Sequence, residues 1–300
     1  MRSFYSNGKL LITGEYVVLD GAKALALPTK FGQKLIVDNG SGKEIRWKSF
    51  DFDGSVWFEE IISFEAIVNK SEDQNPVKNT LIEILHEAYL LSPEFLKTEG
   101  YSVTTKLTFP RLWGLGTSST LINNIAQWLN INAFKLLKNS FGGSGYDIAC
   151  AQNDTPILYH LENGNPIVKK IDFDPEYAPN LYFVYLNKKQ SSKSAIQSYR
   201  EKRSDIAPTI VAIDEITSDI LKAQTLSIFE NLVQKHENIL STILELPTVQ
   251  TSLFPDFNGN LKSLGGWGGD FILVASETDP TAYFKRKGYD IAIPYSEMIL

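Results

Sequence analysis

The pattern of hydrophobic and polar positions divides the first half of the chain into strands and helices. Apolar residues recur at helical spacing over 79–91 and 118–129. The runs 156–160 and 166–172 predict a β-hairpin. Short runs rich in β-branched and aromatic residues, separated by segments that contain Gly, Asp or Asn, predict strands at 9–12, 35–38, 45–47, 56–58 and 101–107. This mixture predicts a fold with both α and β structure.

The second half opens with an apolar run and contains no repeat, low-complexity tract or long linker. The stretch 172–179, rich in Asp and Pro, is the best candidate for a domain boundary. We therefore predict an N-terminal domain over 1–175 and a C-terminal domain over 176–300. The predicted elements of the second half are a strand at 181–186, three amphipathic helices between 194 and 246, and a strand at 271–276.

Composition narrows the class of protein. The 300 residues are 43% hydrophobic, which is enough for substantial cores. A net charge of -6 without a dominant basic stripe argues against nucleic-acid and anionic-membrane partners. One cysteine excludes an intramolecular disulfide and a Cys-rich metal site. No apolar run approaches the roughly 20 residues of a membrane span, and the strand pattern begins too early for a signal peptide, so we expect a cytoplasmic protein.

Three glycine-rich segments carry the candidate chemistry, at 6–21, 110–120 and 262–270. In the middle segment, Gly114 and Gly116 let the backbone approach a phosphate, and the hydroxyls that follow precede a predicted helix. An ordinary connector between two elements has the same appearance, so this segment alone decides nothing. It lacks the Gly-Lys-Ser/Thr ending of a Walker loop and the third glycine of a dinucleotide fingerprint.

Together the three segments resemble the GHMP kinase superfamily, named for galactokinase, homoserine kinase, mevalonate kinase and phosphomevalonate kinase. The central motif of that family reads Pro-x-x-x-Gly-Leu-Gly-Ser-Ser-Ala. It is matched here at Pro110, Gly114, Leu115, Gly116 and Ser118, with Thr117 replacing the first serine and Ser119 the alanine.

The two outer segments match the family in the same order along the chain. Gly8, Lys9, Gly14 and Glu15 match its opening Gly-Lys-x-x-x-x-Gly-Glu, and the next residue, Tyr16, is typical of phosphomevalonate kinases. The segment from Lys262 to Asp270 resembles the closing Lys-x-x-Gly-Ala-Gly-Gly-Gly-Asp loop, again with the aspartate typical of phosphomevalonate kinases. The resemblance therefore covers the whole chain.

A fourth match supplies the catalytic hypothesis. Residues 144–149 resemble the family's Ser-Gly-x-Asp-x-Ala segment, whose aspartate is the catalytic base of several members. Phosphoryl transfer from ATP needs an acceptor oxygen in line, charge neutralisation and a destination for the acceptor's proton. Asp147 is the predicted base and Lys9 its predicted cationic partner. Outside these motifs, such an Asp is usually a helix cap and such a Lys a solvated surface charge.

The resemblance implies an α+β, two-domain GHMP kinase fold, with an N-terminal α/β domain of the ribosomal-protein-like type and a C-terminal ferredoxin-like domain. It implies ATP and Mg²⁺ as cofactors and a small-molecule acceptor as partner. The sequence leaves the oligomeric state open, a homodimer included. Nucleotide contacts are expected from Gly114, Leu115, Gly116, Thr117, Ser118 and Ser119. Acceptor contacts are expected from Glu15, Tyr16, Ser144, Gly145, Lys193, Ser194, Gly265, Gly266 and Gly268.

Three positions depart from the family pattern. Leu136 stands where mevalonate kinases carry a magnesium-binding glutamate, so Mg²⁺ would depend on the Ser118 hydroxyl and the nucleotide phosphates. Leu264 stands where mevalonate kinases carry a threonine. Trp267 replaces a glycine, and it either fills ligand space or packs as core.

The basic, serine-rich stretch 187–203 follows a predicted strand. Lys188, Lys193 and Ser194 are candidates for holding an anionic acceptor, and a solvated surface loop is the competing interpretation. The function predicted from all these features is an ATP-dependent kinase for a mevalonate-pathway acid, with phosphomevalonate preferred over mevalonate. The alternatives are a catalytically weak nucleotide or metabolite sensor, and a GHMP kinase with another acceptor.

Overall fold

The computed structural model describes residues 1–188, 196–197, 199–201 and 205–300. The chain forms two compact units, each assembled from separate stretches of sequence. The first unit contains Met1–Gly8, Phe31–Arg111 and Leu115–Gln152, and the second contains Lys9–Lys30, Leu112–Gly114 and Asn153–Leu300. Because the two units are interleaved along the chain, their bounds differ from those of the predicted consecutive domains, 1–175 and 176–300. The division into those domains stays a prediction.

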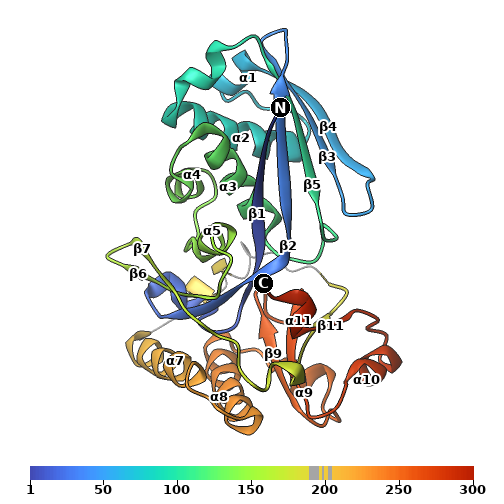
Figure 1. The fold of residues 1–300 in the computed structure, drawn as a ribbon. Coiled ribbons are helices and arrows are strands. Elements are labelled where there is room, and N and C mark those ends of the chain that lie inside the picture. Colours follow the sequence, from blue (N-terminus) through green and yellow to red (C-terminus); the bar gives the residue numbers. More distant parts are fainter. Residues whose placement is uncertain (189–195, 198, 202–204) are drawn as a thin grey trace. The chain divides into compact units, whose positions relative to one another are not determined.

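The first unit is built on strands paired mostly in antiparallel fashion (Figure 1). Its strands are the first part of β1 (Arg2–Leu11), the second part of β2 (Ala24–Asn39), β3 (Glu44–Phe50), β4 (Val56–Ser63) and β5 (Tyr101–Leu107). Strand β3 pairs antiparallel with β4 and parallel with β5, which pairs antiparallel with β2. Alternate residues of β5 are buried, as the period of a strand with one covered face requires.

Helices cover one face of these strands, as α2, α3 and α4 show in Figure 1. The helices of this unit are α1 (Phe64–Val68), α2 (Pro76–Leu91), η2 (Pro93–Lys97), α3 (Thr117–Leu129), α4 (Ala133–Ser140) and α5 (Tyr146–Ala151). Their apolar faces meet the strands in one core that includes Trp47, Leu85, Val103 and Ile125, all nearly inaccessible to solvent. This packing fixes α3 and α5, which carry the candidate chemistry.

The second unit contains an antiparallel sheet in the order β11-β8-β10-β9. Its strands are β8 (Leu181–Tyr185), β9 (Asn260–Leu264), β10 (Phe271–Ala275) and β11 (Ala292–Pro294). Its helices are η1 (Val17–Asp20), η3 (Ala178–Asn180), α7 (Ala207–Ile220), α8 (Leu226–Leu244), α9 (Val249–Leu253), α10 (Thr281–Arg286) and α11 (Tyr295–Met298). The hairpin of β6 (Ile157–Glu162) and β7 (Asn165–Lys170) joins this unit by pairing with residues 24–26 of β2.

The predicted α+β class is confirmed, and the predicted hairpin and long helices are present. Strand β2 begins at Ala24, well before the predicted start at residue 35, because its first residues are buried on both faces and do not alternate. The first of the three helices predicted after residue 194 lies partly outside the described residues. Across the described part of the chain, no helix combines the length and apolar character that crossing a membrane demands.

Candidate functional site

The middle glycine segment leads directly into α3. Gly116 has a positive φ of 95° and occupies the position before the helix, where a left-handed residue turns the chain into the first turn. The first N–H groups of a helix have no carbonyl one turn earlier, so they point toward any anion placed there. Ser118 is exposed at this end and Thr117 is half-buried, whereas the Leu115 side chain is fully buried. Leu115 can therefore contact a nucleotide only through its backbone.

Gly114, within the second unit, stands at a position where only glycine fits. Its φ is 71°, and a Cβ added there would lie 2.4 Å from Cγ of Asp270. The Lys9 Nζ donates a hydrogen bond to the Gly114 carbonyl oxygen, 3.2 Å away. The predicted catalytic ammonium therefore lies against Gly114, as does the Asp270 carboxylate.

Asp147, in the first unit, lies in the first turn of α5, which follows Gly145 in a left-handed conformation. Its Oδ2 accepts a very short hydrogen bond from the Ser119 hydroxyl, and its Oδ1 accepts from the Ile148 N–H at 3.1 Å. The carboxylate is partly exposed. Asp147 thus joins the first turns of α3 and α5. Since Lys9 belongs to the other unit, its pairing with Asp147 stays a prediction.

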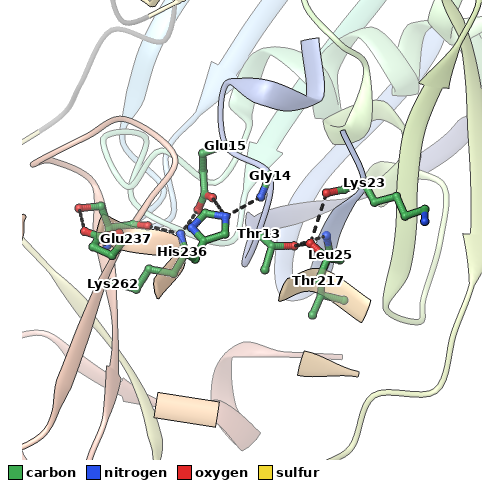
Figure 2. Close-up of polar contacts among 10 residues, drawn as sticks. Thr13, Gly14, Glu15, Lys23, Leu25, Thr217, His236, Glu237 and Lys262 are labelled. Atoms are coloured by element: carbon green, nitrogen blue, oxygen red, sulfur yellow. Dashed lines mark hydrogen bonds and ion pairs between the residues drawn. The ribbon is translucent and has the colours of Figure 1, made fainter. Parts of the chain in front are cut away.

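Glu15 belongs to a buried group of ionisable side chains in the second unit, which we call the Lys262 cluster: Glu15, His236, Glu237 and Lys262 (Figure 2). The Lys262 ammonium donates to Glu15 Oε1 in a very short contact and to the Ser263 carbonyl oxygen at 2.8 Å. Burial raises the pKa of Glu15, and the Lys262 ammonium opposes that shift. Separating the two side chains would leave a charge unpaired in the interior at a large cost in free energy, so the Glu15–Lys262 ion pair stays together.

The two α8 members of the cluster bind backbone groups. His236 Nε2 accepts a hydrogen bond from the Gly14 N–H at 2.9 Å, so the ring is neutral and its proton is on Nδ1. Burial, and secondarily the Lys262 ammonium, lowers the pKa of His236 well below its ordinary value. Glu237 Oε1 accepts from the Ser263 N–H at 3.0 Å and from its hydroxyl at 2.8 Å. Burial raises the pKa of Glu237 to about 7.

The sequence gives one signal for the α8 members of this cluster. The buried face of α8 runs through Phe229, Leu232, Val233, Leu240 and Leu244, and His236 and Glu237 interrupt that apolar stripe. Oε1 of Glu15 is engaged by Lys262, and the Glu15 side chain is almost wholly buried. The contact that the sequence predicts between Glu15 and the acceptor stays a prediction.

The closing glycine segment is the turn of the β9–β10 hairpin, in which Phe271 pairs with Leu264. Gly265 and Gly268 adopt positive φ angles of 71° and 70°, and Gly266 is buried. The Tyr16 hydroxyl accepts from the Trp267 N–H at 2.9 Å, and the indole N–H donates to the Pro247 carbonyl oxygen at 3.0 Å. Trp267 packs beside buried Tyr16, Val17 and Leu240. This contact set supports the interpretation of Trp267 as core.

Of the remaining predicted contacts, Ser144 is half-buried and Gly145 buried at the start of α5. Lys188 contributes its carbonyl oxygen, which accepts from the Asp270 N–H at 2.7 Å. Lys193 and Ser194 lie outside the described residues.

No protein-family model matches the chain, and no curated protein matches it in sequence. Solved structures match nearly its whole length. Phosphomevalonate kinase of Streptococcus pneumoniae, in complex with phosphomevalonate and AMPPNP, is 16% identical with a TM-score of 0.70, covering 96% of each chain. Mevalonate kinase of Methanococcus jannaschii is 15% identical with a TM-score of 0.68, covering 96% of this chain and 94% of that one. Galactokinase of Lactococcus lactis, complexed with galactose, is 14% identical with a TM-score of 0.70, covering 95% and 88%.

The chain has the GHMP kinase fold. Within this fold, Leu136 is a fully buried core residue of α4, so it offers no metal ligand. The part of the chain that the structure describes also contains no group of three or more His, Cys, Asp or Glu side chains able to hold a metal ion. The exposed Ser118 hydroxyl fits the one or two protein ligands that Mg²⁺ commonly takes beside substrate phosphates.

Proposed function

We propose that the protein is an ATP-dependent small-molecule kinase of the GHMP type. One observation carries the proposal: the carboxylate of the predicted base, Asp147, is one hydrogen bond from Ser119 at the N-terminus of α3, the predicted phosphate-binding end. Phosphoryl transfer brings an acceptor hydroxyl and a triphosphate together. The hydroxyl requires a base, and the triphosphate requires an anion-binding group such as a helix N-terminus. The fold shared with kinases supports the same conclusion.

The proposed reaction forms a bond between the acceptor oxygen and the γ-phosphorus of ATP and breaks the bond to the β-phosphate oxygen, releasing ADP. Asp147 takes the proton of the acceptor hydroxyl, or orients an acceptor oxygen that is already ionised. Lys9 offsets the negative charge on the transferring group. The N–H groups at the start of α3 bind the phosphates. Mg²⁺, held by the Ser118 hydroxyl and the triphosphate, would supply further charge neutralisation.

For the acceptor we propose a mevalonate-pathway acid, with phosphomevalonate preferred over mevalonate. Tyr16 and Asp270 in the outer glycine segments favour phosphomevalonate. Structural neighbours act on unrelated acceptors at similar identities, among them galactokinase at 14% and phosphomevalonate kinase at 16%. A sugar therefore stays an alternative acceptor. Leu136 keeps a catalytically weak nucleotide or metabolite sensor as a second alternative.

The test is magnesium-dependent release of ADP from ATP by the purified chain, with mevalonate, phosphomevalonate, homoserine and galactose offered in parallel. Stimulation by phosphomevalonate alone supports the proposal in full. Stimulation by another of the four compounds supports the proposed kinase activity and shows that the acceptor is a different one. Nucleotide binding without stimulation by any of them favours the sensor.

The predicted base is tested by Asp147→Asn. This change removes the proton acceptor with little change in size, so we expect kcat to fall by on the order of 10² or more. The KM and binding affinity for ATP should change little, because the phosphate contacts come from α3. Asp154→Asn, an exposed position after α5, is the matched control. Full activity in Asp147→Asn would remove Asp147 from the mechanism.

A further inference from the structure

The Ser119 hydroxyl faces the predicted base. Ser119 is the third residue of α3 and is only 5% exposed, whereas its neighbour Ser118 is exposed. A serine hydroxyl has one proton to donate, and that of Ser119 goes to Asp147 Oδ2. The backbone N–H of Ser119 still belongs to the phosphate-binding end of α3. The sequence predicts that Ser119 contacts the nucleotide, whereas its side chain binds Asp147 in the structure.

Both oxygens of the Asp147 carboxylate are held. Oδ2 accepts from Ser119 and Oδ1 accepts from the Ile148 N–H. A carboxylate bonded at both oxygens keeps one rotamer and keeps its remaining lone pairs in fixed directions. A bond from an adjacent N–H follows from the backbone position, whereas the bond from Ser119 comes from another helix. Ser119 therefore sets the direction of the carboxylate relative to α3.

The contact is repeated one helical turn along the same helices. Asn123, four residues after Ser119 on α3, donates to the Ala151 carbonyl oxygen at 3.4 Å. Its side-chain oxygen accepts from Gln152 Nε2 at 2.9 Å. Residues four apart lie on one face of a helix, so Ser119 and Asn123 present one polar face to α5 and its end. The separation of the two helices is thus fixed at two points, and only the first of them touches the carboxylate.

We propose that Ser119 is a positioning residue that aims the Asp147 carboxylate at the acceptor oxygen. This inference rests on the proposed function and adds a residue to it. The motif that this segment resembles carries alanine at the position of Ser119, and an alanine has no hydroxyl to make this bond. Catalysis by a base depends on its direction, and a displacement of about 1 Å can cost on the order of 10²-fold in rate.

The test compares Ser119→Ala with Ser119→Thr, which keeps the hydroxyl. For Ser119→Ala we expect kcat to fall by roughly tenfold to a hundredfold, with the KM for ATP within about twofold of wild type. Ser119→Thr should recover most of the loss. Ser140→Ala is the matched control, since it deletes a serine hydroxyl that donates to the Leu136 carbonyl oxygen within α4. A raised KM for ATP with unchanged kcat would assign the hydroxyl to the nucleotide instead and overturn the proposal.

A double-mutant cycle with Asp147→Ala gives the second measurement. If Ser119 acts through Asp147, adding Ser119→Ala to Asp147→Ala lowers kcat no further, whereas independent roles multiply. The thermal midpoints of the same four proteins should be non-additive in the same way, and this readout needs no turnover. Additive midpoints would refute the hydrogen bond. If wild type releases no ADP with any acceptor while the midpoints are non-additive, the proposed function fails but the contact stands, so the two failures are distinct.

Discussion

At the residue scale, the protonation of Glu237 affects stability near neutral pH. Its pKa rises from an ordinary 4.5 to about 7 because it is buried. Between these values the folded state holds a proton that the unfolded state releases. The stabilisation from this group is therefore complete below about pH 4.5 and is lost as pH rises through about 7. At 1.36 kcal/mol for each pKa unit, the loss reaches about 3 kcal/mol.

Glu237→Gln removes this dependence and keeps an oxygen that can accept from Ser263. We expect the free energy of unfolding of this variant to exceed that of wild type by up to about 3 kcal/mol at pH 8, and to approach it at pH 5. Urea unfolding between pH 5 and 8 measures the difference, with Glu176→Gln at an exposed position as control. A difference that does not change with pH would contradict the assignment.

At the element scale, Lys262 joins β9 to the segment that follows β1. Lys262→Met leaves the Glu15 carboxylate buried without its cation, and breaking a buried pair in this way costs about 3 to 5 kcal/mol of stability. Adding Glu15→Gln removes the unpaired charge and should recover a large part of that loss. Denaturant unfolding measures the free energy of unfolding of both variants, with Lys285→Met at an exposed position as control. An equal or greater loss in the double variant would show that the charge is not the cause.

Elements with a clean period could be predicted from the sequence and elements without one could not. Strand β5 and helix α3 were predicted to within one residue because one face of each is buried and the other is polar. Helices α4 and α5 and strand β9 were not predicted, since short segments provide too few turns or alternations to display a period. Loop glycines were informative because only a positive φ or a close approach requires them, as at Gly114.

At the scale of the whole molecule, the candidate chemistry within each unit depends on contacts between residues far apart in the sequence. Ser119 and Asp147 are 28 positions apart, and Glu15 and Lys262 are 247 apart. The glycine motifs mark these regions, and the motifs carry no information about which side chains pair. The hydrogen bond of Ser119 and the Lys262 cluster therefore required coordinates.

Nucleotide binding should stabilise the molecule as a whole. A ligand that binds only the folded state at 100 times its Kd adds about 2.7 kcal/mol to the free energy of unfolding. For a chain of this size we expect Mg²⁺ with AMPPNP to raise the thermal midpoint by several degrees, and Mg²⁺ alone to leave it nearly unchanged. Scanning fluorimetry over a range of AMPPNP concentrations provides the measurement. A midpoint that stays constant up to millimolar AMPPNP would argue against a nucleotide site.

The chain's single cysteine, Cys150, is fully buried on α5, three residues after Asp147. A thiol reagent such as dithionitrobenzoate can reach it only when this part of α5 opens. When closing is faster than the reaction, the rate at which the unmodified protein reacts measures the fraction of molecules in which this part of the helix that carries the predicted base is open. No introduced label is needed, and the colour released by the reagent follows the reaction of this one thiol.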